Sequence, residues 1–185
     1  MKVEKTAIGD VLLITPVVHA DARGYFFESY REEIYAAKGL PTRFVQDNQA
    51  ASTQGVLRGL HYQLHFPQGK LVQVVLGTVY DVAVDIRRGS PTFGQYVGYI
   101  LTEENHHQFY IPEGFAHGYC VISEQAVFQY KCTETYHPED EYGIRWDDPE
   151  IAIDWPIENP LLSEKDASLP ALKAVPTHHL PEFKA

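Results

Sequence analysis

Cysteine and methionine are scarce in this chain, which has two Cys and one Met among 185 residues. The spacing between Cys120 and Cys132 matches neither a short metal-binding pair nor a redox pair. We therefore expect two buried thiols in a reducing, cytoplasmic compartment rather than a disulfide framework. The length suffices for one domain with a real hydrophobic core, so neither a disulfide nor a metal is needed for folding.

Long apolar runs and an excess of basic residues are also lacking. No stretch approaches the roughly 20 apolar residues that cross a bilayer, and Glu4 and Asp10 interrupt the apolar patch near the N-terminus. We therefore expect neither a membrane partner nor a signal peptide. Asp and Glu outnumber Lys and Arg by 25 to 15, a formal charge of −10. This balance argues against a nucleic-acid partner but is compatible with a local basic pocket for one small phosphate.

Strand patterns dominate what is present. Tyr and Phe number 12 and 9, and aromatic residues favour half-buried strands. The alternation of Val82, Val84 and Ile86 with polar or small residues predicts a strand with one apolar face. An apolar run precedes it, so residues 71–86 suggest a hairpin that turns at Gly77. Further strands are expected over 94–102, 107–112, 116–122 and 126–132. Many short strands at this spacing predict an all-β sandwich or barrel.

Helix signals are few. Ser29 is placed to cap a helix over 30–38 that Gly39 would end. Ser163 and Asp166 form an S-x-x-D start for a second short helix. Residues 173–185 contain two prolines and little periodicity, so we expect a loosely held tail after a single domain of residues 1–172.

The densest group of chemically able side chains lies between positions 46 and 70. Its members are Gln46, Asp47, Asn48, Arg58, His61 and Lys70. Strand parity would place Arg58 and His61 on opposite faces, but a bulge at Gly59 would turn both toward one cavity. Burying so many polar groups without a ligand would cost about 1–3 kcal/mol for each group left without a hydrogen bond. A lone histidine is usually structural, but this grouping favours a binding site.

Three further segments are polar. In 112–117 a P-x-G-x-x-H turn feeds a strand, and His117 is suited to be a metal ligand, an anion donor or a base. Tyr130 either fills the barrel or donates a proton, since a free phenol, with a pKa of about 10, is protonated at neutral pH. Around Arg23 and Glu28, the segment alone reads as a turn and an edge strand with solvated charges.

A metal centre is not indicated. Zinc or iron in a β-barrel takes three or four converging ligands, often His-x-His and a carboxylate. Tyr62 and Gln63 follow His61, so the second histidine of that pattern is missing. The adjacent His106 and His107 would point to opposite faces of a strand. We therefore expect no metal and no cofactor.

Seven segments in order carry a family resemblance. They are D-x-R-G-x-F-x-E at 21–28, QDN at 46–48, VLRGLHYQ at 56–63, GKLV at 69–72, IPEGFAHGY at 111–119, the segment 130–136, and SEKD at 163–166. With these, residues 1 to about 172 resemble the dTDP-4-dehydrorhamnose 3,5-epimerase family. The resemblance implies a cupin-type jelly roll with a few short helices that forms a homodimer by exchange of N-terminal strands. It also implies metal-free epimerisation of dTDP-4-dehydro-6-deoxy-D-glucose at C3 and C5.

The resemblance further implies residue roles. His61 would be the general base, oriented by Asp166; Tyr130 would be the acid on the opposite face, and Lys70 would lie near the C4 oxygen or the diphosphate. The implied substrate-binding residues are Arg23, Glu28, Gln46, Asp47, Asn48, Arg58, His117, Tyr136, Glu141 and Lys165. Among these, Tyr136 would stack on thymine, and strand exchange makes Arg23 and Glu28 candidates for the partner subunit's site.

Three other functions are compatible with the pattern. One is a related epimerase that acts at C3 or C5 alone; Tyr130 favours the full activity. Another is a non-catalytic cupin-type sugar-binding module, against which the combination of His61, Asp166 and Tyr130 argues. The last is a metal-dependent cupin enzyme, against which the missing His-x-His pattern argues.

Overall fold

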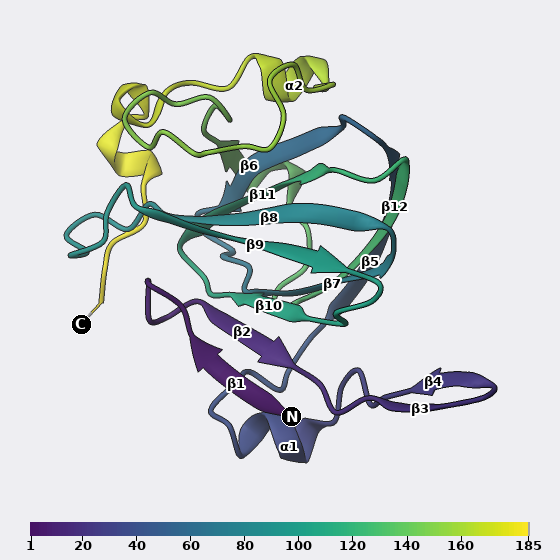
Figure 1. The fold of residues 1–185 in the computed structure, drawn as a ribbon. Helices are drawn as coiled ribbons and strands as arrows, with labels where there is room; N and C mark the ends of the chain where they lie inside the picture. Colours follow the sequence, from purple (N-terminus) through teal and green to yellow (C-terminus); the bar gives the residue numbers. More distant parts are fainter. Residues whose placement is uncertain (185) are drawn as a thin grey trace.

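Two antiparallel β-sheets face each other in the computed structural model, which describes residues 1–184 (Figure 1). The six-stranded sheet has the order β1 (Lys2–Lys5), β2 (Leu12–Thr15), β10 (Gln108–Ile111), β7 (Lys70–Leu76), β12 (Gln125–Cys132) and β5 (Gln46–Thr53). The five-stranded sheet has the order β13 (Glu141–Gly143), β6 (Leu57–Gln63), β11 (Phe115–Val121), β8 (Thr78–Asp85) and β9 (Tyr96–Thr102). This arrangement confirms the predicted all-β fold, a jelly roll of the cupin type with a few short helices.

Alternating side chains from both sheets form the central core. Phe109 and Phe128 of the six-stranded sheet and Leu101 of the five-stranded sheet are almost fully buried in one cluster. Because successive side chains of a strand point to opposite faces, each of these strands also presents a second set of residues outward. What covers those outer faces differs between the two sheets.

Strands β7 and β8 are correctly predicted, but their pairing as a hairpin is wrong. The two strands belong to different sheets, and the chain crosses from one sheet to the other at Gly77. Gly77 has a φ of +80°, and a Cβ there would lie 2.1 Å from the Gln125 carbonyl oxygen. Only glycine fits so tight a crossing.

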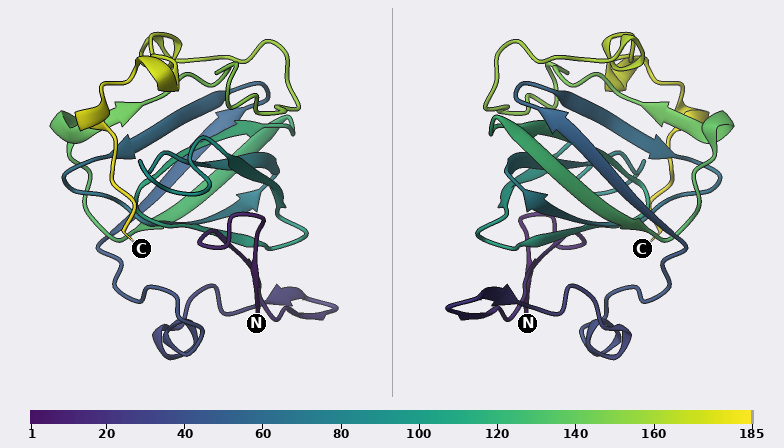
Figure 2. Two further views of the ribbon diagram at one scale, coloured as in Figure 1. Left: turned by 90° about the vertical axis from the view of Figure 1, so that its left-hand side faces the viewer. Right: turned by 90° about the vertical axis from the view of Figure 1, so that its right-hand side faces the viewer.

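The C-terminal segment covers the outer face of the five-stranded sheet (Figure 2). Val175 and Leu180 are buried in one cluster with Val82 and Val84 of β8. Around them lie two 3-10 turns, η2 (Leu172–Ala174) and η3 (Thr177–His179). The prediction of a loosely held tail is therefore wrong for residues 173–184, and residue 185 lies outside the described residues. For the same reason β8 is buried on both faces, not on one.

The N-terminal arm, residues 16–45, packs against the outer face of the six-stranded sheet through Tyr35 and Leu40. Its hairpin, β3 (His19–Asp21) and β4 (Gly24–Phe26), projects away from the sandwich (Figure 1). Helix α1 (Glu32–Ala36) is shorter than predicted and has no side-chain cap at its N-cap, Arg31. Ser29 instead accepts a hydrogen bond from Gln108 Nε2 at its carbonyl oxygen, 2.6 Å away. Within residues 1–184 no helix is long and apolar enough to cross a membrane.

A row of four glutamines crosses the outer face of the six-stranded sheet. Gln129 Nε2 donates to Gln49 Oε1 at 2.8 Å, and Gln73 Nε2 donates to Gln129 Oε1 at 3.2 Å. Gln108 Nε2 donates to Gln73 Oε1 at 3.0 Å, and Gln108 also accepts a hydrogen bond from Tyr35 of α1. This glutamine row links β5, β12, β7 and β10 and ties the N-terminal arm to them.

Candidate active site

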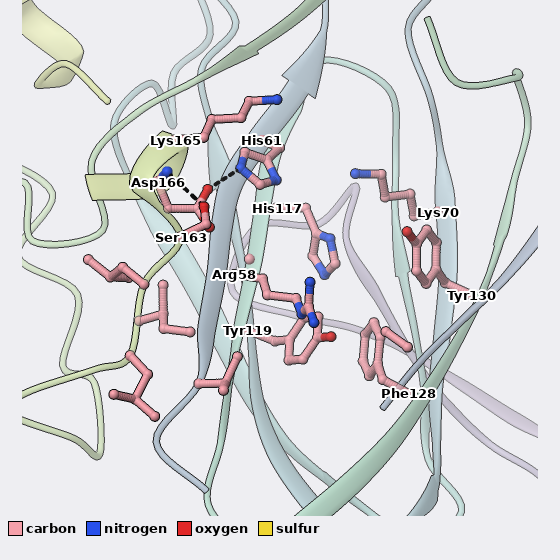
Figure 3. Close-up of a pocket in the computed structure, with 16 residues that line it drawn as sticks. Arg58, His61, Lys70, His117, Tyr119, Phe128, Tyr130, Ser163, Lys165 and Asp166 are labelled. Atoms are coloured by element: carbon pink, nitrogen blue, oxygen red, sulfur yellow. Dashed lines mark hydrogen bonds and ion pairs between the residues drawn. The ribbon is translucent and has the colours of Figure 1, made fainter. Parts of the chain in front are cut away.

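A cavity of about 450 Å³ opens between the two sheets, lined mainly by β6, β11, β12 and the segment around Ser163 (Figure 3). A second cavity of about 320 Å³ adjoins it. His61, Lys70 and Tyr130 line both cavities. The predicted catalytic side chains therefore lie where the two cavities meet.

A bulge in β6 turns Arg58 and His61 into the first cavity. On β11, their partners Tyr119 and His117 are two positions apart, whereas Arg58 and His61 are three positions apart. The extra residue lies in β6, where Gly59 has a φ of +111°. A Cβ at Gly59 would lie 2.6 Å from the His117 carbonyl oxygen. The bulge predicted from strand parity is confirmed, and its tight contact explains the glycine.

His61 and Asp166 form a close pair at one wall of the first cavity. His61 Nε2 lies 2.5 Å from Asp166 Oδ1, and Asp166 is 4% exposed. Helix α2 (Glu164–Ala167) holds Asp166, and the Ser163 hydroxyl accepts a hydrogen bond from its backbone N–H at 3.0 Å. The predicted cap is confirmed. Burial raises the pKa of Asp166, but the hydrogen bond from His61, the charge of His61 and the hydrogen bonds from Ser163 and Gly59 together outweigh it and hold that pKa below its ordinary value.

This pairing determines what His61 can do chemically. A carboxylate that accepts the Nε2 proton leaves Nδ1 without a proton, and Nδ1 is then free to accept one. In Figure 3 the ring nitrogen not bound by Asp166 faces the cavity. An imidazole held in this way can serve as a general base, with the carboxylate orienting it.

Tyr130 and Lys70 lie across the cavity from His61 (Figure 3). They come from β12 and β7 in the six-stranded sheet, whereas His61 comes from the five-stranded sheet. Burial raises the pKa of Tyr130 to about 12, so its phenol keeps its proton at neutral pH. Burial lowers the pKa of Lys70. A proton acceptor and a proton donor thus face one space from opposite walls.

His117 is held by a residue that the sequence analysis did not select. Its Nε2 lies 3.0 Å from Asp81 Oδ2, and both side chains are buried. Burial raises the pKa of Asp81 and lowers that of His117, so both shifts disfavour charge separation within the pair. The signal that could have identified Asp81 is its acidic side chain within the largely apolar strand β8.

The second cavity gathers four of the residues predicted to bind the substrate, Gln46, Asn48, Tyr136 and Glu141. Glu141 is central there, since its carboxylate accepts hydrogen bonds from the Tyr136 hydroxyl and from Lys165 Nζ. Its other oxygen lies 3.7 Å from His61 Nδ1. Burial raises the pKa of Glu141, but these hydrogen bonds outweigh it and lower that pKa. Gln46 accepts a hydrogen bond from the Tyr136 backbone N–H at 2.8 Å, and Asn48 also lines this cavity.

Three predicted binding residues lie elsewhere in this chain. Asp47 alternates with Gln46 and Asn48 along β5, so it faces away from the cavities, and it pairs with Lys131 at 2.9 Å. Arg23 pairs with Asp21 in the projecting hairpin, and Glu28 pairs with Arg31 at 3.2 Å. None of the three touches the site within one chain.

Two residues that line the first cavity, Tyr119 and Phe128, were missed. Tyr119 of β11 stacks on Phe128 with ring centroids 4.1 Å apart. Arg58 Nη2 donates to Ser52 Oγ at 3.1 Å. The signal for Tyr119 was its position two residues after His117, which places both side chains on one face of the strand.

Within residues 1–184, no group of three or more His, Cys, Asp or Glu side chains is arranged to hold a metal ion.

The family model for dTDP-4-dehydrorhamnose 3,5-epimerase matches residues 5–174 of this chain. The chain belongs to the dTDP-4-dehydrorhamnose 3,5-epimerase family. It is 58% identical to the family's enzyme from Pseudomonas aeruginosa over 168 residues, which covers 90% of this chain and 93% of the relative. The identity to the enzyme from Methanothermobacter thermautotrophicus is 50% over 177 residues, covering 94% and 96%.

Solved structures agree with this assignment. The crystal structure of the dTDP-6-deoxy-D-glucose-3,5-epimerase from Legionella pneumophila, in complex with dTDP-4-keto-L-rhamnose, superimposes with a TM-score of 0.97. Its sequence is 52% identical, and the match covers 100% of this chain and 99% of that one. The family resemblance predicted from seven segments is therefore confirmed, and the chain is an isomerase of the epimerase class.

Proposed function

We propose that this chain converts dTDP-4-dehydro-6-deoxy-D-glucose to dTDP-4-dehydro-L-rhamnose by epimerising C3 and C5, a step of dTDP-L-rhamnose biosynthesis. The observation that carries the proposal is the juxtaposition of the His61–Asp166 pair and Tyr130 on opposite walls of one cavity. Binding alone does not need a paired acceptor and donor that face each other.

The chemistry of the substrate suits these residues. C3 and C5 both flank the C4 ketone, so a proton on either carbon becomes acidic once the enolate is stabilised. His61 takes that proton on one face, the C–H electron pair moves into the enolate, and Tyr130 returns a proton on the other face. Lys70 places a cation beside the developing oxyanion, and such a contact is typically worth about 3 kcal/mol of barrier. The reaction changes no oxidation state.

The two cavities divide the substrate between them. The nucleoside occupies the second cavity, where Tyr136, 49% exposed, offers an aromatic face to thymine. The sugar then occupies the first cavity, beside His61 and Tyr130. Lys165 lies at the border and offers its cation to the diphosphate.

A homodimer is part of the proposal. The projecting hairpin exposes Tyr25 and Phe26, at 57% and 67%, although large aromatic side chains on a protruding hairpin favour burial against a partner. Arg23 and Glu28 flank them and lie away from this chain's own site. We therefore assign Arg23 and Glu28 to the partner subunit's site, which they would reach by exchange of N-terminal strands. Cys120 and Cys132 are free buried thiols, which suits a cytoplasmic location.

Proton NMR in deuterated buffer tests the proposed reaction. The protein is mixed with dTDP-4-dehydro-6-deoxyglucose in the presence of a chelator, and deuterium is followed at C3 and C5. Incorporation at both carbons by the wild type, and loss of both in His61→Asn, is the expected result. Incorporation at one carbon alone would instead identify a single-site epimerase. No incorporation with nucleotide still bound would contradict catalysis and leave a sugar-binding module.

A further inference from the structure

The loop that carries Tyr136 lies outside the regular secondary structure. Strand β12 ends at Cys132, and a 3-10 turn, η1 (Pro138–Asp140), begins soon after it. Residues 134–137 between them belong to no strand or helix. Tyr136 is 49% exposed at the second cavity, so burial alone does not fix the position of its ring. A ring that is to meet a ligand at a fixed place needs another support.

Glutamine side chains supply hydrogen bonds that a sheet would otherwise give this loop. Gln63 Oε1 accepts a hydrogen bond from the His137 backbone N–H at 2.8 Å, and Gln63 Nε2 donates to the Thr135 carbonyl oxygen at 3.1 Å. Gln68 Nε2 donates to the Glu134 carbonyl oxygen at 2.8 Å. The loop backbone is therefore held at three positions, on both sides of the tyrosine.

The amide of Gln63 is fully engaged with the protein. Gln63 is 5% exposed, and its Nε2 also donates to the Phe66 carbonyl oxygen at 2.6 Å. Both Nε2 protons are therefore used, and Oε1 holds the His137 N–H. A ligand in the second cavity would find no free amide proton on Gln63, although Gln63 lines that cavity. Gln63 therefore acts through the loop and not by touching the ligand.

The segment that follows β6, residues 64–68, is itself anchored. The Asp140 carboxylate accepts hydrogen bonds from the backbone N–H groups of His65 and Phe66, the shortest at 2.8 Å in each case. The Phe66 ring stacks on His137, with ring centroids 4.0 Å apart and planes within 10° of parallel. The two loops therefore hold each other in place.

We infer that Gln63 and Gln68 are positioning residues that hold the loop 134–137 so that Tyr136 presents its ring to the nucleoside. This inference rests on the proposed function for the placement of the nucleoside in the second cavity. It gives neither glutamine a part in proton transfer. Their contribution is to affinity for the nucleotide, whereas turnover of bound substrate depends on His61 and Tyr130.

Calorimetry with dTDP, steady-state kinetics and amide hydrogen exchange on Gln63→Met test this role. Methionine keeps the length of the side chain but removes the amide. We expect the affinity for dTDP to fall about 5-fold, the lower end of what loss of one base–aromatic stack costs. KM rises by a similar factor, while kcat stays within about 2-fold of wild type. In the free variant the His137 amide, which loses its acceptor, exchanges about 5-fold faster.

A double variant separates positioning from direct contact. In a Tyr136→Ala background, Gln63→Met should cost no further affinity for dTDP, because the ring that the loop positions is already gone. Gln68→Ala changes a half-buried side chain at the other end of the loop and should lower the affinity about 3-fold. Gln68→Ala carries the test if Gln63→Met does not fold.

Gln54→Met is the matched control. Gln54 Nε2 also donates to a backbone carbonyl oxygen, that of Ile122 at 2.8 Å, but Gln54 lines neither cavity. The affinity for dTDP should therefore be that of the wild type.

Two results would overturn the inference. Unchanged dTDP affinity in Gln63→Met, or in Gln68→Ala if the first variant is unfolded, would show that Tyr136 needs no support from these amides. An undiminished loss in the Tyr136→Ala background would show that Gln63 contacts the nucleotide itself. Failure of the proposed function is a separate observation, since it would appear as wild-type protein that binds dTDP yet exchanges no substrate proton.

Discussion

His61 Nε2 and Asp166 Oδ1 lie 2.5 Å apart although 105 sequence positions separate the two residues. Strand β6 supplies the imidazole, and the first turn of α2, capped by Ser163, supplies the carboxylate. The Ser163 cap therefore does more than start a short helix. It holds the Asp166 carboxylate against His61 Nε2, and this contact favours the imidazole tautomer that carries its proton on Nε2. Catalysis should depend on that carboxylate's charge as well as on its shape.

Asp166→Asn tests this dependence. The amide keeps the size of the side chain but can donate to Nε2, which favours the wrong tautomer and removes the negative charge. We expect kcat to fall by orders of magnitude, toward the roughly 10⁴-fold loss seen when the orienting aspartate of a serine protease is changed to asparagine, with the affinity for dTDP nearly unchanged. Asp147→Asn, which alters an exposed partner of Arg145, should leave kcat unchanged. Activity of Asp166→Asn within a factor of three of wild type would contradict the role.

Tyr130→Phe should separate the two halves of the reaction. Removing the phenol deletes the proton donor of the six-stranded sheet and leaves His61 in place. We expect epimerised product to decline far more than the exchange of substrate protons with solvent deuterium. NMR of one reaction mixture measures both rates. Equal loss of the two would show that Tyr130 is not the acid.

The alkaline side of the pH–rate profile should report Lys70. Burial lowers its pKa from the ordinary 10.5, whereas burial raises the pKa of Tyr130 to about 12. As pH rises, Lys70 therefore loses its charge before Tyr130 loses its proton, and kcat/KM falls because the enolate loses its cation. Lys70→Arg stays charged, so its lower activity should persist to higher pH. An unchanged alkaline limb in Lys70→Arg would exclude Lys70 as the titrating group.

Gly59→Ala should disrupt the bulge. With a φ of +111°, a Cβ there would lie 2.6 Å from the His117 carbonyl oxygen and 2.7 Å from Gly118 Cα. We expect the free energy of unfolding to decrease by about 3 kcal/mol or more, with loss of activity in any folded fraction. At Gly89, φ is +81° and no atom lies within 4 Å of a built Cβ. Gly89→Ala should therefore cost only about 1 kcal/mol. Denaturant titration of both variants makes the comparison.

Leu180→Ala tests how firmly the C-terminal segment is held. Leu180 is 7% exposed in the cluster over β8, so its truncation should lower the free energy of unfolding by about 2–4 kcal/mol. Lys173→Ala, at an exposed position of the same segment, should change it by less than about 0.5 kcal/mol. Similar melting temperatures for the two variants would support the loosely held tail that the sequence predicted.

Local patterns predicted most strands and the pieces of the site. Parity along 58–61 separates Arg58 and His61 onto opposite faces unless a bulge intervenes, and glycine at 59 is the residue that allows one. The S-x-x-D pattern at Ser163 placed the cap that holds Asp166. In each case neighbouring residues determine the geometry, so the sequence was sufficient.

Partners distant in sequence were not predicted. An apolar run on either side of Gly77 indicates two strands, but nothing local shows that they enter different sheets. The burial of β8 on both faces depends on Val175 and Leu180, about ninety positions away, and a proline-rich segment shows no period that reveals this contact. The pairing of Asp81 with His117 was missed for the same reason, since the two residues lie on different strands.

The glutamine row bears on the position of Tyr130, the proposed proton donor. Gln129 precedes Tyr130 on β12, and its amide is bonded to Gln49 on one side and Gln73 on the other. A slip of β12 by two residues would keep every side chain on its proper face, so the pattern of apolar and polar residues alone would not oppose it. Such a slip would carry Tyr130 about 7 Å along the strand and out of reach of a sugar held beside His61. It would also break both side-chain hydrogen bonds of Gln129. The glutamine row on the outer face of the sheet therefore helps to fix the position of the proposed proton donor on the inner face.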